Sequence, residues 1–202
     1  MIQTTGQQKT VSSTEEFSGR SPGIGLDPVH RSPLPDPGDW HLLPDLITAD
    51  QIHAVNPQRF EMHQLDGILS IDDDRQEILG YRHLADNPFA SEIHAKNVGQ
   101  GTIQAGPRWT EVAAQVSAYY LKRLDFGGMG INFGIGGIYG LEFHHASLNG
   151  HRLYVLSRAI SVDAPVSARM EFEGYVDSTP FFSGEILLMP LKCLDRSAGR
   201  SA

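Results

Sequence analysis

Apolar residues surround the helix axis between Pro107 and Leu124 instead of forming one stripe. This pattern predicts a long helix that is buried on most sides. Pro107 suits the first helical position, basic residues occupy the expected last turn, and two glycines follow it. We therefore expect this helix to form the centre of the core.

Period-two alternation, typical of strands, dominates the chain after this helix. The predicted strands are Gly130 to Tyr139, Gly140 to Ala146, Arg152 to Val162, Ala168 to Val176 and Phe181 to Met189. Before the helix, Phe60 to Ile71 and Glu77 to His83 predict a hairpin around an acidic turn, preceded by a short helix that ends before Asn56-Pro57. One long helix with consecutive antiparallel strands predicts an α+β domain in which a curved sheet wraps the helix.

The 202 residues suffice for one core with appendages. Residues 1–38 are rich in Pro, Ser, Thr, Gln and Gly and lack periodicity, so we expect a disordered leader. A single domain is expected over residues 39–192, and a flexible C-terminal tail over residues 193–202.

Composition and charge narrow the class of protein. Hydrophobic residues make up 40% of the chain and the formal net charge is -8, which argues against a dedicated nucleic-acid binder. No apolar run of membrane-spanning length and no secretory signal is present in the sequence, so we expect a cytoplasmic protein without a membrane partner. The single cysteine, Cys193, excludes an intrachain disulfide and lies in a polar tail that does not favour a nucleophile.

Several polar residues have simple structural explanations. Glu111 in the first turns of a helix is favoured by the helix dipole without any catalysis, and His94 lies in a polar loop. His144 and His145 are neighbours in an expected strand and should face opposite sides, so we expect no metal site. The glycine-rich segment after the helix lacks the lysine of a phosphate-binding loop, and its aromatic neighbours should lie mostly in the core.

Four blocks together resemble the 3-hydroxyacyl-acyl-carrier-protein dehydratases of the FabZ/FabA type. These blocks are NPQRFEMHQLDGILSID, GYRHLADNPF, GPRWTEVAAQ, and FGIGGIYGLEF through NGHRLYV. The resemblance implies a hot-dog fold and a catalytic histidine and carboxylate that face each other across a dimer interface. Counting forward from Phe89 places the histidine at His94, with a three-residue loop insertion; counting back from Glu111 places Asn97 there instead. We prefer His94 because loops absorb changes of length readily.

The resemblance also implies the remaining parts of a site. Gly99 or Gly101 would supply a backbone N–H to the thioester carbonyl, and Gly106 and Phe89 would border the substrate. Gln115, one helical turn after Glu111, would orient its carboxyl group. Two departures weaken the match: the glycine and proline of the family's G-H-x-P-G loop are replaced around His94, and the basic residues that face a carrier protein are missing.

The leading hypothesis is a dehydratase that eliminates water from a 3-hydroxyacyl thioester in fatty-acid or polyketide-type biosynthesis. The acyl group would be carried on acyl carrier protein or coenzyme A, and the enzyme would need neither a metal nor another cofactor. An exposed sheet edge and an interfacial site imply a homodimer or a higher homo-oligomer. The alternatives are a hot-dog thioesterase and a non-catalytic hot-dog subunit that has lost the chemistry together with its loop.

Overall fold

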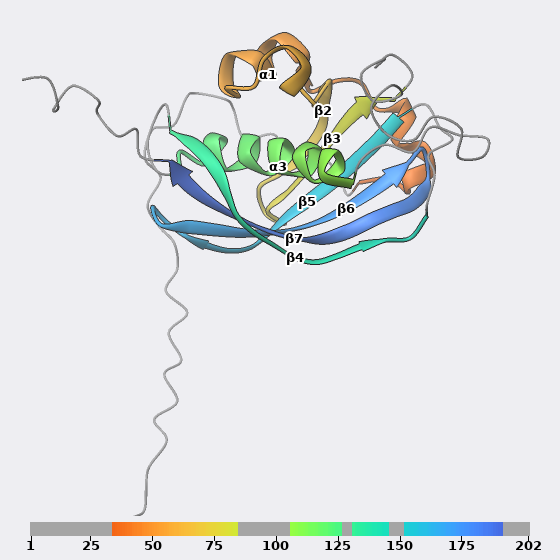
Figure 1. Cartoon of the computed structure of the whole chain (residues 1–202). Helices are drawn as coiled ribbons and strands as arrows, with labels where there is room; N and C mark the ends of the chain where they lie inside the picture. Colours follow the sequence, from red (N-terminus) through yellow and green to blue (C-terminus); the bar gives the residue numbers. More distant parts are fainter. Residues whose placement is uncertain (1–33, 85–105, 127–130, 146–151, 192–202) are drawn as a thin grey trace, which may run out of the picture.

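A curved antiparallel sheet packed on one long helix forms the body of the molecule (Figure 1). The computed structural model describes residues 34–84, 106–126, 131–145 and 152–191. The sheet has seven strands in the order β1-β2-β3-β5-β6-β7-β4. Helix α3 lies in the concave side of this sheet, and the expected α+β class is confirmed. No helix in the described part of the chain is both long and apolar enough to cross a membrane.

The elements follow the chain in a simple order. Four short elements come first: the 3-10 helix η1 (Pro37–Leu42), β1 (Ile47–Thr48), α1 (Ala49–Val55) and the 3-10 helix η2 (Phe60–Met62). The main body then consists of β2 (Gly67–Asp72), β3 (Glu77–His83), α3 (Gly106–Arg123), β4 (Asn132–Phe143), β5 (Arg152–Asp163), β6 (Ser167–Val176) and β7 (Thr179–Leu191).

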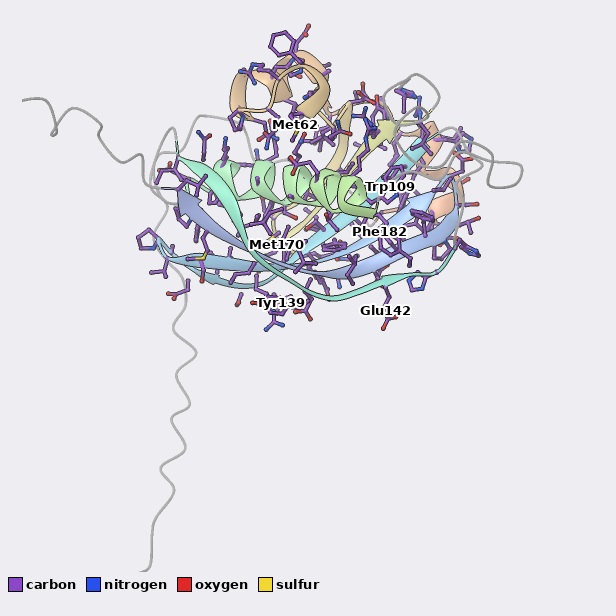
Figure 2. All side chains as sticks on the ribbon, in the orientation of Figure 1. Met62, Trp109, Tyr139, Glu142, Met170 and Phe182 are labelled. Carbon is purple, nitrogen blue, oxygen red and sulfur yellow. The ribbon has the colours of Figure 1, made fainter. Side chains whose placement is uncertain are left out.

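Helix α3 is the core element that the sequence predicts. Val112, Val116 and Tyr120 are buried on one face, and Ala114, Ala118 and Leu121 are buried on the opposite face, which confirms that apolar contacts surround the helix. Figure 2 shows Trp109 on the helix with Phe182 on the sheet below it. At about 25 cal/mol per Å² of buried apolar surface, these contacts are the main source of stability for the fold.

Helix α1 covers the side of α3 that faces away from the sheet (Figure 1). Its start is fixed by the Thr48 N–H, which donates to Gln51 Oε1 at 2.9 Å. Its end is joined to α3, because Lys122 Nζ donates to the carbonyl oxygen of Val55 at 2.7 Å. The short helix expected before Asn56 is confirmed. Helix α3 is therefore enclosed between the sheet and a small cap made of α1 and η2.

Three of the expected strands are wrong in detail. The strand expected over residues 60–71 begins only at Gly67, because residues 60–62 form a 3-10 turn in which Phe60 has a φ of 54°. The two strands expected over residues 130–146 are one continuous strand, β4, in which Gly140 has a φ of 56° and lies at an irregularity in the pairing with β7, between Tyr139 and Glu142. Glycine tolerates this positive φ, so the strand bends there without ending.

The outer face of the sheet carries a second, smaller apolar cluster. Trp40 packs edge-on against Tyr154 and Tyr175, and its indole N–H donates to the carbonyl oxygen of Pro35 at 2.9 Å. Leu34 packs on the same cluster. These contacts thus involve Leu34 and Pro35, which lie in the last part of the segment 1–38 that was expected to be a leader.

Strand β4 is an edge strand with an exposed apolar surface. Among the described strands it pairs with β7 alone, and its side chains Ile135, Tyr139, Leu141 and Phe143 are exposed. The expectation that the aromatic residues after the helix are mostly core is confirmed, because Phe126, Phe181 and Phe182 are buried and Phe133 packs against the core. Tyr139 and Phe143 are the exceptions. A long edge with apolar side chains is a surface that another strand can cover.

Candidate functional site

Glu111 and Gln115 lie one turn apart on the first half of α3, on the side covered by the cap. Gln115 Nε2 donates a hydrogen bond of 2.7 Å to Glu111 Oε1. Gln58 Nε2 donates to the same oxygen at 3.4 Å. Glu111 is partly exposed, whereas Gln115 is completely buried. The carboxylate is thus held in a fixed orientation at the boundary between core and solvent.

Gln115 is fixed by the chain segment that follows α1. Its Nε2 also donates to the carbonyl oxygen of Met62 at 2.7 Å, and its Oε1 accepts from the Gln64 N–H at 2.9 Å. The backbone carbonyl of Gln115 accepts from Asn56 Nδ2 at 3.2 Å. Every polar atom of the Gln115 side chain therefore has a partner, as a buried amide requires.

Two arginines reach the same segment from different elements. Arg82, on β3, donates from Nη1 to the carbonyl oxygen of His63 at 2.9 Å. Arg108, on the first turn of α3, donates from Nε to Gln64 Oε1 at 2.8 Å. Burial lowers the pKa of both guanidinium groups, and the charge of Arg82 lowers the pKa of Arg108 further. Glu111, Gln115, Gln64 and the two arginines thus belong to one hydrogen-bonded network.

A pair of histidines joins α1 to this network. The rings of His53 and His63 lie 3.9 Å apart between centroids, with 62° between their planes. Burial is the main cause of the lowered pKa of His63, and the charge of His53 lowers it further. His63 is therefore held as a neutral imidazole near neutral pH.

The structure brings together only part of the site expected from the sequence. Glu111 and Gln115 are hydrogen-bonded as their spacing indicates, and Gly106 is the first residue of α3. The remaining expected residues, Phe89, His94, Gly99 and Gly101, and the alternative Asn97, lie outside the described residues, as does Cys193.

The network contains residues that the sequence did not single out. Arg108 is three residues before Glu111, so helical spacing alone could have placed it on the same face. Arg82 and Gln64 carry no such signal, because their contacts join a strand and a loop to a distant helix. Within the described ranges, no group of three or more His, Cys, Asp or Glu is placed to hold a metal ion.

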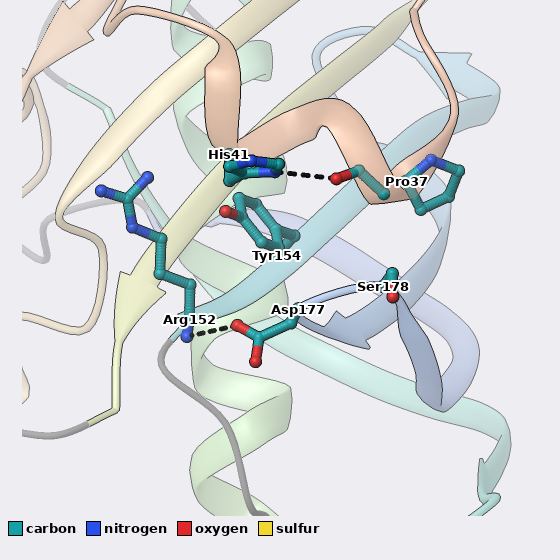
Figure 3. Close-up of a pocket in the computed structure, with 7 residues that line it drawn as sticks. Pro37, His41, Arg152, Tyr154, Asp177 and Ser178 are labelled. Atoms are coloured by element: carbon teal, nitrogen blue, oxygen red, sulfur yellow. Dashed lines mark hydrogen bonds between the residues drawn. The ribbon is translucent and has the colours of Figure 1, made fainter.

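A pocket of about 290 Å³ lies on the outer face of the sheet, away from this network (Figure 3). It lies between η1 and the start of β5, and its lining includes His41, Arg152 and Tyr154. The Asp177 carboxylate accepts the Arg152 backbone N–H at 3.1 Å, and the His41 ring is bonded to the Gly38 carbonyl oxygen at 2.7 Å. These two hydrogen bonds join residues of the protein to one another and stabilise the turns that border the pocket.

Comparison with solved structures identifies the fold. A chain of the dehydratase heterocomplex ApeI:P from Xenorhabdus doucetiae matches with a TM-score of 0.56 and 13% identity, over 70% of this chain and 91% of that chain. The virulence protein Cj0977 from Campylobacter jejuni matches with a TM-score of 0.48 and 15% identity, over 72% of this chain and 93% of that chain. The thioesterase PA1618 from Pseudomonas aeruginosa, as its Q49A mutant, matches with a TM-score of 0.45 and 11% identity, over 63% of this chain and 82% of that chain.

No protein-family model and no curated protein matches this chain. At 13% identity, the likeness to the chain of the dehydratase heterocomplex concerns the fold alone. The antiparallel sheet packed on central helix α3 is a hot-dog fold.

Proposed function

We propose that this protein is a hot-dog enzyme that eliminates water from a 3-hydroxyacyl thioester, with Glu111 as one of its catalytic groups. The observation that carries the proposal is the fixed carboxylate: Glu111 Oε1 accepts a 2.7 Å hydrogen bond from the fully buried Gln115. A carboxylate that serves only to favour a helix start needs no such support. Orienting a reacting group in this way is a major source of catalytic rate.

The proposed reaction uses an acid and a base. His94 removes the α-proton, the electron pair of the C–H bond forms the new double bond, and the β C–O bond breaks. Glu111 protonates the departing hydroxyl group, which leaves as water. A backbone N–H of Gly99 or Gly101 holds the enolate oxygen that develops on the thioester. Proton return from His94 to Glu111 then restores the starting state.

A thioesterase is the second candidate, and one observation favours it. Glu111 Oε1 accepts from two amide groups, Gln115 Nε2 and Gln58 Nε2. Two such donors would orient the carboxylate toward a water molecule that attacks the thioester carbonyl. The two activities give different products, an enoyl thioester or a free thiol with a carboxylic acid.

We also propose that the protein acts as a homodimer that forms along β4, with the acyl group presented on acyl carrier protein or coenzyme A. The apolar side chains exposed along β4, Ile135, Tyr139, Leu141 and Phe143, support this dimer. Pairing of two β4 strands would join the sheets and remove the exposed edge.

Product analysis tests the activity. The protein is incubated with 3-hydroxyacyl and 2-enoyl thioesters on both carriers, and products are resolved by mass spectrometry. We expect interconversion of the two, reduced at least about 100-fold in Glu111→Gln because an acid or base is lost. Glu173→Gln, a matched change at an exposed position of β6, should keep full activity.

Each other outcome has a clear meaning. Free thiol released by wild-type protein would favour the thioesterase. Absence of turnover on every thioester would contradict both activities and favour the non-catalytic subunit. Retained activity in Glu111→Gln would remove Glu111 from the mechanism.

A further inference from the structure

Two arginines of the network around Glu111, Arg82 and Arg108, form no ion pair with a described residue. Arg82 is only 7% exposed, and Arg108 Nη2 is buried with no hydrogen-bond partner among the described residues. Asp66 is the acidic group whose charge acts on Arg82, and its Oδ2 already accepts the His83 N–H at 2.6 Å.

Buried cations without a paired anion are costly, so they are usually balanced by a ligand or a partner group. The geometry here brings the two cations together, because Arg82 binds the carbonyl oxygen of His63 and Arg108 binds the side chain of Gln64, the next residue. The unpartnered Arg108 Nη2 is a donor ready for an oxyanion. Guanidinium groups match carboxylate and phosphate oxygens better than any other side chain.

The position of these cations relative to Glu111 indicates what they bind. Arg108 and Glu111 are three residues apart on one helix, so their side chains start roughly 5–6 Å from each other on one face. Gln64 and Gln115 connect them through a 2.9 Å hydrogen bond. An anion at Arg108 would therefore lie close to the group on which Glu111 acts.

We propose that Arg82 and Arg108 form a subsite for an oxyanion, carboxylate or phosphate, carried by the thioester substrate. This inference rests on the proposed function, because it assigns a specificity to the same site. Two sources of the anion share this chemistry: a carboxylate at the end of a short acyl group, and the phosphate of the pantetheine arm. The short distance to Glu111 favours the acyl carboxylate, since the pantetheine arm separates its phosphate from the thioester by many bonds.

Binding of unreactive ligands tests the subsite independently of turnover. The probes are four pantetheine thioethers, with a butyl or a carboxylate-ended acyl mimic, each with and without the 4′-phosphate. Isothermal titration calorimetry compares wild-type protein with Arg108→Met, Arg108→Lys and Arg75→Met. Arg75 is a matched control because it is an exposed arginine in the turn between β2 and β3. Circular dichroism verifies that each variant is folded.

We expect an anionic ligand to bind at least about tenfold more tightly than its neutral analogue, the size of one charge-assisted hydrogen bond. That preference should fall to within about twofold in Arg108→Met, survive in part in Arg108→Lys, and remain intact in Arg75→Met. The ligand that shows the preference, with the acyl carboxylate or with the 4′-phosphate, identifies which of the two groups occupies the subsite.

An anion preference that is absent, or that survives in Arg108→Met, overturns the subsite. Turnover of neutral thioesters without such a preference would overturn the subsite alone. Anion binding that depends on Arg108, without turnover of any thioester, would overturn the proposed activity and leave the subsite standing.

Discussion

Replacement of Gln115 by methionine tests how much this side chain contributes to the attachment of the cap to α3. Gln115 is fully buried, and its amide holds the carbonyl oxygen of Met62 and the N–H of Gln64. Methionine fills a similar volume but bonds neither group. Gln115→Met should therefore leave two backbone groups unsatisfied in the interior.

The magnitude follows from these two groups. Each unsatisfied buried group costs about 1–3 kcal/mol, and methionine recovers some of this by its apolar transfer, which leaves about 3 kcal/mol in total. In a chain of this size 1 kcal/mol shifts the melting temperature by about 2–4 °C, so a fall of roughly 6–12 °C is expected. The third lost bond, to Glu111, should in addition lower kcat.

Differential scanning calorimetry of wild-type protein, Gln115→Met and Gln58→Met measures the effect. Gln58 is the matched control because its amide makes only the 3.4 Å contact with Glu111. Its loss should cost less than about 1 kcal/mol, since weak contacts at partly exposed positions contribute little. A melting temperature for Gln115→Met within 1 °C of wild type would refute the reasoning, because the network would then not hold the cap.

Three further predictions concern packing, pH and assembly. Gly174→Ala should destabilise by about 1–3 kcal/mol, because its Cβ would overlap an aromatic ring of β7, whereas Gly38→Ala meets open space and should be neutral in chemical denaturation. Because the pKa of His63 is lowered in the folded protein, its contribution to stability is present above about pH 6.5 and is lost as the pH falls. His63→Gln should therefore reduce the fall of the melting temperature at acidic pH. The same pH profile in the variant and the wild-type protein would contradict this prediction. Leu141→Lys should convert the proposed dimer to a monomer in light scattering, while Ile160→Lys, at an exposed position of β5, should not; two dimeric variants would exclude β4 as the interface.

Local signals in the sequence account for the elements that were predicted well. Helix α3 has clear start and stop residues and an apolar surface all round, and the hairpin of β2 and β3 surrounds a turn in which Asp72 Oδ1 accepts the N–H groups of Asp74 and Arg75. The glutamine one turn after Glu111 was expected to orient it because helical spacing makes that contact local.

The elements that were predicted wrongly depend on distant contacts. Residues 60–66 read as a strand, yet Gln115 and Arg82 bind the backbone there and hold it in another conformation. Arg82 was missed for the same reason, since only the fold brings β3 next to the start of α3. Strand β4 read as two strands because Gly140 looks like an end, whereas its positive φ is absorbed within one bent strand.

The most direct test of the central claim is turnover of a 3-hydroxyacyl thioester by wild-type protein and by Glu111→Gln, with the enoyl product quantified by mass spectrometry. The account predicts enoyl thioester from wild-type protein and at least about a 100-fold lower rate from a folded Glu111→Gln. Equal rates from the two proteins, or no enoyl product from wild-type protein on either carrier, would contradict it.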